Sequence, residues 1–209
     1  MFLKDHDLVL FQGDSITDMG RREDPNGLGC GYVYTVVSWF TAMQPRMQVR
    51  FLNRGISGDR VANLKARWQE DMLDIKPDVL SVLIGVNDTW RRFDRDDPTS
   101  TEAFESCYRD ILTQAKQANP DLRLILCAPF TVTPPCGDAA AWYADLDPRI
   151  HVVSKLAREF GALYVPLDGE FARACAAQPP EVWAADGIHP DPAGRALIAQ
   201  AWLRAVGAL

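Results

Sequence analysis

The fold of this chain is decided by one stretch near its N-terminus, Leu8-Val9-Leu10-Phe11-Gln12-Gly13-Asp14-Ser15-Ile16-Thr17. An aliphatic run broken by Gly-Asp-Ser is typical of a buried strand that ends in a tight turn. Ser15 is therefore predicted at the carboxyl end of a strand, where open α/β sheets bind their ligands. Taken alone, the same residues fit an ordinary turn with a helix cap equally well, because Gly, Asp and Ser are common turn residues.

Length and composition indicate one globular unit. The chain has 209 residues, of which 47% are hydrophobic, so we expect a single domain spanning residues 1–209. The five cysteines are odd in number and show no C-x-x-C spacing, which indicates neither a disulfide framework nor a zinc site.

Charge and hydropathy narrow the possible partners. The formal net charge is −6 and no run of Lys or Arg exceeds two residues, which argues against a nucleic acid or an anionic membrane as partner. The N-terminal residues lack the pattern of a signal peptide, and no apolar run approaches membrane-spanning length. The predicted location is cytoplasmic. The charge and hydropathy do not exclude small neutral substrates.

Further apolar runs alternate with helical patterns along the chain. The later strands are predicted at 49–53, 79–84, 122–128 and 163–165. Helices are predicted over 32–43, over 61–75, from a capping box at Thr99 and Glu102 to about 118, from Asp147 to about 160, over 170–177 and from Asp191 onward, with 129–141 irregular. Strands separated by helices pair in parallel through right-handed crossovers. The predicted fold is α/β: a three-layer α/β/α sandwich with a five-stranded parallel sheet in the flavodoxin-like order 2-1-3-4-5.

This sheet would gather polar groups from several turns at one edge. Ser15, Gly58 and Asn87 follow the first, second and third predicted strands, so their turns should meet. Each residue also has a plain structural interpretation, because Gly58 fits a turn and Asn87 fits a helix cap. That interpretation does not explain why Ser15, Gly58 and Asn87 should all lie at one edge of the sheet together with a residue that can act as a general base.

The base is predicted to be His189. Of the two other histidines, His6 precedes the first strand and His151 lies in the first turn of a predicted helix. Asp186 stands three residues before His189, where its carboxylate can hold the tautomer of the imidazole. An isolated Asp-x-x-His also fits a turn leading into a helix, but serine, aspartate and histidine together suffice for acyl transfer.

The segments Gly13-Asp14-Ser15, Gly55-Ile56-Ser57-Gly58, Gly85-Val86-Asn87-Asp88 and Asp186-x-x-His189-Pro190 resemble the four sequence blocks of the GDSL or SGNH hydrolases. The resemblance implies that Ser15 is the nucleophile of a triad with Asp186 and His189. It also implies an oxyanion hole made by the N–H groups of Ser15 and Gly58 and by the side-chain amide of Asn87, with no metal and no cofactor. The G-x-S-x-G elbow of α/β-hydrolases is absent, so Ser57 is interpreted as a turn residue.

Within that family, four stretches are most similar to the intracellular bacterial acetyl-xylan esterases, which remove acetyl groups from xylo-oligosaccharides. These stretches are Gly29-Cys30-Gly31-Tyr32-Val33, 53–58, Leu64-Lys65-Ala66-Arg67-Trp68 and Asn87-Asp88-Thr89-Trp90-Arg91. One departure is Ala185, which stands where those enzymes have a tryptophan directly before the triad aspartate. The resemblance further implies a homo-oligomer.

The sequence thus predicts a serine esterase that hydrolyses short acyl esters, with an acetylated sugar as its small-molecule substrate. Residues predicted to bind the substrate are Asp14, Trp90, Phe130 and Trp183. Aromatic residues in such loops serve equally often in packing. Two alternatives remain: a lysophospholipase or thioesterase of the same fold, and a non-catalytic flavodoxin-like binding module, which has no use for Asp186 and His189.

Overall fold

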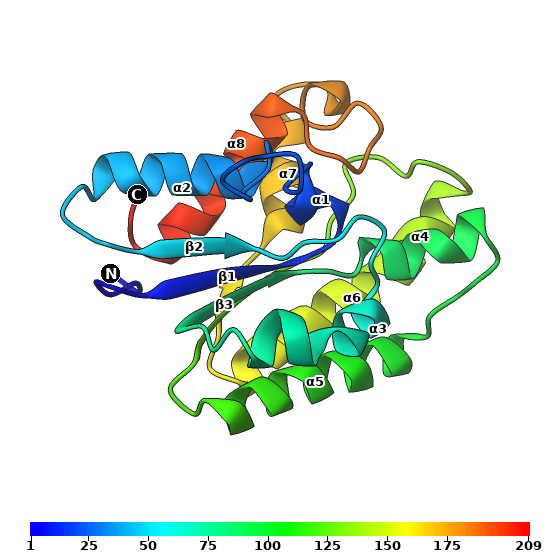
Figure 1. Ribbon diagram of the computed structural model, residues 1–209. Coiled ribbons are helices and arrows are strands. Elements are labelled where there is room, and N and C mark those ends of the chain that lie inside the picture. The colour runs from blue at the N-terminus through cyan, green and yellow to red at the C-terminus, as the bar shows by residue number, and fades with distance from the viewer.

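The computed structural model describes residues 1–209 and contains one five-stranded parallel sheet (Figure 1). The strand order is β2-β1-β3-β4-β5, which confirms the predicted order 2-1-3-4-5. The strands are β1 (Leu8–Gly13), β2 (Arg50–Asn53), β3 (Val79–Leu83), β4 (Arg123–Cys127) and β5 (Leu163–Val165). The carboxyl ends of β1, β2 and β3 therefore lie side by side, as the site prediction requires.

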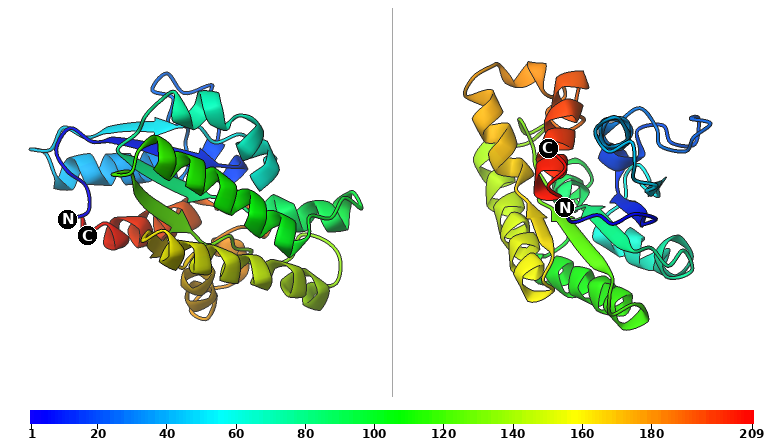
Figure 2. Two further views of the ribbon diagram at one scale, coloured as in Figure 1. Left: turned by 90° about the horizontal axis from the view of Figure 1, so that it is seen from below. Right: turned by 90° about the vertical axis from the view of Figure 1, so that its left-hand side faces the viewer.

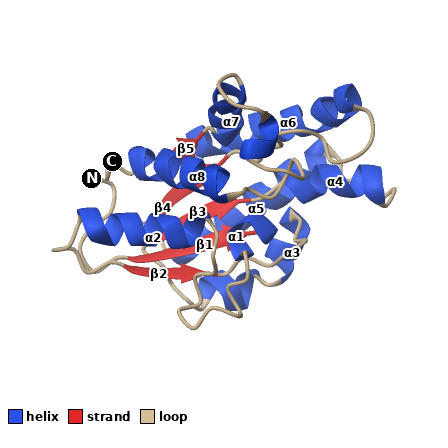
Figure 3. Ribbon diagram, turned by 90° about the horizontal axis from the view of Figure 1, so that it is seen from above, coloured by secondary structure: helices blue, strands red, loops and turns tan.

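Helices cover both faces of the sheet, so the predicted three-layer α/β/α sandwich is confirmed (Figures 1 and 2). Seen from above, α2, α7 and α8 lie over the strands (Figure 3), whereas α3, α5 and part of α6 lie beneath them. The helices are α1 (Ser15–Asp18), α2 (Tyr32–Met43), α3 (Val61–Ala66), α4 (Val86–Asp94), α5 (Thr101–Ala118), α6 (Ala139–Glu159), α7 (Leu167–Cys175) and α8 (Pro192–Ala205), with a π-helical turn at Gln69–Leu73 and a 3₁₀ turn at Pro180–Val182.

The central strands hold the layers together because they are buried on both faces. All residues of β1 and β3 are buried. Successive side chains of a strand point to opposite faces, and accordingly Leu10 packs with α3 and α5, whereas Phe11 packs with α2 and α8. One polar contact crosses the core, where the indole N–H of Trp202 donates to Ser81 Oγ at 3.0 Å.

The chain ends lie side by side in every view, and Phe2 N–H donates to Val206 O at 2.9 Å. No helix combines the length and the apolar character needed to cross a lipid bilayer.

Three predicted helices have boundaries that differ from the structure, and one of them is α7, which spans Leu167–Cys175 rather than 170–177. Helix α6 begins at Ala139 rather than Asp147, because Asp138 caps it by accepting Ala141 N–H at 2.9 Å. Pro148 consequently lies inside the helix, where burial of Trp142 and Leu146 in the core stabilises the turns before it. The irregular segment predicted over 129–141 thus ends at 138. Helix α5 is capped by Ser100 rather than Thr99.

The region around the site also differs from expectation in two places. Residues 86–94 form α4, although 85–90 reads as a strand-end loop in the sequence. The helix predicted over 61–75 is interrupted after Ala66 and continues as the π-helical turn. Arg67 stands at the interruption and donates to Asp59 and Asp71, at 2.8 and 2.9 Å. Interruptions of this kind are frequent at functional sites.

Candidate active site

The turn after β1 places Ser15 at the first position of α1. Asp14 caps this helix by accepting Ile16 N–H at 3.0 Å. A side chain at Gly13 would collide with Thr17 and with the carbonyl of Leu83, so the turn fits tightly between β3 and α1. The result is a serine hydroxyl that projects from a rigid corner at the edge of the sheet.

A hydrogen-bonded chain runs from Ser15 through His189 to Asp186. Ser15 Oγ lies 2.8 Å from His189 Nε2, and His189 Nδ1 lies 2.6 Å from Asp186 Oδ2. Because an ionised carboxylate can only accept, Nδ1 carries the proton and Nε2 is free to accept from the Ser15 hydroxyl. This arrangement gives the imidazole the tautomer of a general base.

The loop from 186 to 189 holds the aspartate in place. Asp186 Oδ1 accepts the N–H groups of Ile188 and His189 at 2.9 and 2.7 Å. Gly187 has φ +83° and no room for a side chain against Thr133, so only glycine suits this turn. Partial burial acts to raise the pKa of Asp186, but the hydrogen bonds from His189 and the two backbone N–H groups outweigh it and hold that pKa below its usual range. Asp186 is therefore a carboxylate at neutral pH.

Two further donors lie beside this chain. Gly58 adopts φ +87°, and its N–H donates to no other group of the protein. Asn87 is buried at the start of α4; its side-chain N–H₂ donates to Asp59 O at 3.1 Å, and its Oδ1 accepts from Arg91 at 2.9 Å. An amide N–H₂ carries two hydrogens, so one donor of Asn87 remains.

Together these groups form the set needed for acyl transfer: a hydroxyl nucleophile, an oriented base and donors suited to an oxyanion. The structure joins Ser15, His189 and Asp186 by hydrogen bonds and ties Asn87 to Asp59, the residue after Gly58. The oxyanion hole itself stays a prediction. No group of three or more His, Cys, Asp or Glu side chains is arranged to hold a metal ion.

Arg91 was missed by the sequence analysis. It lies four residues after Asn87, a spacing that brings side chains together only on a helix, and α4 was not predicted. The guanidinium of Arg91 also lies 5.0 Å from the ring centre of Trp90, whose ring is 6.1 Å from that of His189. Trp90 thus stands beside His189, and its role in binding substrate stays a prediction.

Two of the residues predicted to bind substrate, Asp14 and Phe130, are buried. Asp14 is 1% exposed and turned into the protein, because its carboxylate caps α1. Phe130 is also 1% exposed and stacks on Phe171 with ring centres 4.2 Å apart. Burial removes both from the set of substrate contacts. Trp183 is half-buried, and its carbonyl accepts Asp191 N–H at 2.9 Å before α8.

Comparison with known proteins agrees with this geometry. The pattern of the GDSL-like Lipase/Acylhydrolase family matches residues 11–197. The chain belongs to this family. As a GDSL-like acylhydrolase it is a carboxylic ester hydrolase.

Relatives of this GDSL-like acylhydrolase are similar over nearly their whole length. An acetylxylan esterase of Geobacillus stearothermophilus is 36% identical over 208 residues, which covers 95% of this chain and 93% of the relative. The crystal structure of a putative GDSL-like lipase from Parabacteroides merdae has a TM-score of 0.94 at 36% identity, covering 99% of this chain and 98% of the other. The structure of Axe2, an acetylxylan esterase from Geobacillus stearothermophilus, has a TM-score of 0.91 at 34% identity, with 99% and 97% covered.

Proposed function

We propose that this acylhydrolase is a serine esterase that removes short acyl groups, chiefly acetyl, from xylo-oligosaccharides through an acyl-enzyme. The observation that carries the proposal is the unbroken hydrogen-bonded chain from Ser15 through His189 to Asp186. Catalytic mutants of Axe2 are known in which a serine, an aspartate and a histidine are each replaced by alanine. The same three residue types form the chain of contacts here.

In the proposed reaction, Ser15 Oγ attacks the acyl carbon while His189 Nε2 takes the hydroxyl proton. The Asp186 carboxylate stabilises the imidazolium that forms. The N–H groups of Ser15 and Gly58 and the amide of Asn87 bind the negative carbonyl oxygen of the tetrahedral intermediate. His189 then returns the proton to the leaving alcohol, and a water molecule hydrolyses the acyl-enzyme by the same steps.

The surroundings favour a polar leaving group over a lipid. A cavity of about 370 Å³ has Gly58 in its lining, and none of its eight lining residues is hydrophobic: Ser57, Gly58, Asp59, Arg60, Asn63, Arg91, Arg95 and Asp97. Hydroxyl-rich sugars can bond to such side chains, whereas a long acyl chain would gain no apolar contact there. The ring of Trp90 adds a face on which a sugar can stack.

Kinetics on a series of esters tests the proposal. We expect hydrolysis of p-nitrophenyl acetate and of peracetylated xylose, with rates falling steeply towards the decanoate. A preference for decanoate would favour the lysophospholipase or thioesterase alternative. An inactive parent protein would favour the binding module.

The nucleophile is tested by replacing it. Ser15→Ala should lose roughly three or more orders of magnitude in turnover, as removing a member of such a triad does. Ser38→Ala, at an exposed serine of α2, is the matched control and should keep the parent rate. Mass spectrometry after sulfonyl fluoride treatment should find the adduct on Ser15, and labelling of Ser57 instead would overturn the assignment.

The homo-oligomer implied by the resemblance stays a prediction. Helix α2 offers it a surface, since Tyr34 and Trp39 are 49% and 42% exposed. Light scattering coupled to size-exclusion chromatography measures the oligomeric state directly.

A further inference from the structure

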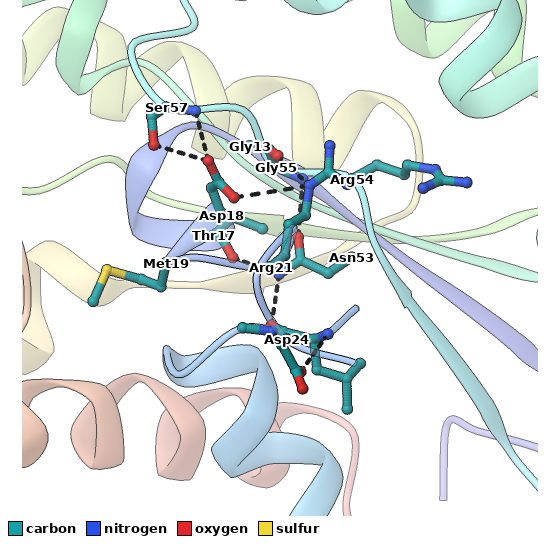
Figure 4. Close-up of polar contacts among 12 residues, drawn as sticks. Gly13, Thr17, Asp18, Met19, Arg21, Asp24, Asn53, Arg54, Gly55 and Ser57 are labelled. Carbon is teal, nitrogen blue, oxygen red and sulfur yellow. Dashed lines mark hydrogen bonds and ion pairs between the residues drawn. The ribbon is translucent and has the colours of Figure 1, made fainter. Parts of the chain in front are cut away.

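Figure 4 shows a set of polar contacts that joins α1 to the loop after β2. Asp18 is the last residue of α1, the helix that Ser15 begins. Its Oδ2 accepts both the backbone N–H of Ser57, at 3.1 Å, and the Ser57 hydroxyl, at 2.8 Å. Ser57 directly precedes Gly58, so one carboxylate oxygen links the nucleophile helix to the residue before an oxyanion donor.

Other contacts anchor the earlier part of the same loop. Asn53 donates to Thr17 O at 2.6 Å and accepts Gly55 N–H at 2.9 Å. Arg21 donates to Gly55 O at 2.6 Å, and its Nε lies 3.9 Å from Asp18 Oδ1. These groups hold residues 53–55, but none of them reaches Ser57.

The two segments are also in direct contact. A Cβ at Gly55 would lie 2.5 Å from Asp18 N and 2.8 Å from the carbonyl carbon of Thr17. No side chain separates the loop from α1, and the Asp18 carboxylate is mostly shielded from solvent, with 16% of the side chain exposed. The Asp18 carboxylate therefore lies at the edge of a close-packed boundary, from which it reaches the exposed Ser57.

Gly58 depends on its neighbours for its orientation. Its N–H has no partner within the protein, and no atom lies within 4 Å of the position that a Cβ would occupy. Glycine also has more backbone freedom than any other residue, so the left-handed conformation of Gly58 is not fixed by its own side chain. The peptide that carries the Gly58 N–H is attached to Ser57, and Asp18 holds Ser57 by both its N–H and its hydroxyl.

We propose that Asp18 is a positioning residue that, through Ser57, directs the Gly58 N–H toward the oxyanion formed at Ser15. The inference rests on the proposed esterase function. Asp18 touches neither the substrate nor the reacting atoms in this scheme. Asp18 keeps the Gly58 N–H pointing toward the oxyanion before the reaction begins. A donor oriented in advance stabilises the transition state without having to reorganise.

Removing the carboxylate should affect turnover far more than binding. Misplacement of a positioned group by about 1 Å can cost roughly a hundredfold in rate. We expect Asp18→Ala to lower kcat on p-nitrophenyl acetate by roughly 10- to 100-fold with KM changed less than about twofold, because the ground-state carbonyl is barely held. Asp18→Asn keeps one acceptor oxygen for Ser57 and should recover most of kcat.

A partner variant and a matched control sharpen the test. Ser57→Ala removes only the hydroxyl donor, so its kcat should fall less than that of Asp18→Ala, and the two changes together should be less than additive because they share one contact. Asp24→Ala is the control: the Asp24 carboxylate accepts three backbone N–H groups, those of Asn26, Leu28 and Gly29 at 3.1, 2.9 and 3.0 Å, but it does not contact Ser57. It should leave kcat unchanged even where it lowers stability.

The outcomes separate this inference from the proposed function. If Ser15→Ala keeps the parent rate, the esterase mechanism itself fails. If Ser15→Ala is inactive but Asp18→Ala keeps its kcat, or raises only KM, Asp18 has no positioning role. Should Asp18→Ala fail to fold by circular dichroism, Ser57→Ala decides alone: a lowered kcat at constant KM supports the role, and an unchanged kcat overturns it.

Discussion

At the scale of single residues, Asn87 is held at both ends of its amide before any substrate binds. Its N–H₂ donates to Asp59 O and its Oδ1 accepts from Arg91. The group is buried at 2% exposure, so water competes little for the remaining N–H. A donor fixed in this way acts on the charge that develops in the transition state.

Asn87→Ala should therefore lower kcat by roughly 100- to 1000-fold while KM moves little, since the ground-state ester gains little from this donor. Asn87→Asp should be at least as damaging, because it places an acceptor and a like charge beside the oxyanion. Steady-state kinetics on an acetate ester measures both, with exposed Asn26→Ala as the control. A normal kcat with a raised KM would instead make Asn87 a substrate-binding residue.

At the scale of elements, Arg149 fastens α6 to the segments around α4. Its guanidinium is 1% exposed and donates to Asp145 on the same helix, to Thr99 O before α5 and to Asp88 O at 3.5 Å. A buried guanidinium of this kind satisfies several backbone carbonyls at once. It thereby keeps α4, and with it Asn87, in a fixed position relative to the sheet.

We expect Arg149→Ala to lower the free energy of unfolding by about 1–3 kcal/mol, because it leaves the Thr99 carbonyl without this partner and the Asp145 carboxylate paired with Arg92 alone. Urea unfolding followed by circular dichroism measures the loss. Arg158→Ala is the control on the same helix, since Arg158 is exposed and its side chain donates only to Ser154 Oγ. A loss below about 1 kcal/mol would show that the Arg149 contacts are replaceable.

Elements with strong local signals could be predicted, and those formed by tertiary contacts could not. The buried strands are continuous apolar runs, so their positions could be predicted, and their alternation with helices indicated the strand order. That order in turn predicted that the turns carrying Ser15, Gly58 and Asn87 meet at one edge of the sheet. Helix α4 has little local signal, because its first residues, Val86-Asn87-Asp88-Thr89, are mostly typical of turns and are helical here in a fully buried setting.

The same distinction holds for the site. Asp186 and His189 are close in sequence, so their pairing could be predicted from spacing. The contact of Asp18 with Ser57, by contrast, joins the end of α1 to a loop 39 residues later, and side-chain pairs of that kind leave no periodic pattern. Pro148 misled the prediction of α6, because proline is favoured in the first turn of a helix.

At the scale of the whole molecule, two buried carboxyl groups link stability to pH. Asp14 and Asp88 are 1% and 0% exposed, and each accepts one backbone N–H, from Ile16 and Val61. The other oxygen of each carboxyl has no hydrogen-bond partner. Burial, which disfavours the charged form, raises the pKa of both groups to about 7.

These raised pKa values make the native state bind more protons than the unfolded chain between about pH 4 and pH 7. In the unfolded chain the carboxyl ionises near 3.8, whereas in the folded protein it ionises near 7. The stability that each group contributes is therefore fully present below about pH 3.8, falls as the pH rises through 7, and is level above that. Carboxylates with lowered pKa values, such as Asp186, act in the opposite direction at lower pH.

Asp88→Asn isolates one of these contributions, because its amide oxygen can still accept Val61 N–H while the side chain no longer titrates. Relative to the parent, the variant should gain roughly 1–4 kcal/mol in unfolding free energy between pH 5 and pH 8, since each pKa unit corresponds to about 1.4 kcal/mol. Urea unfolding at half-unit pH steps measures the difference, and Asp147→Asn, the same change at an exposed position of α6, controls for the loss of one carboxylate. A parent and an Asp88→Asn variant whose stabilities run parallel across that range would mean that Asp88 is ionised in the folded protein, where the positive charges of Arg149 and Arg60 act to lower its pKa against the effect of burial.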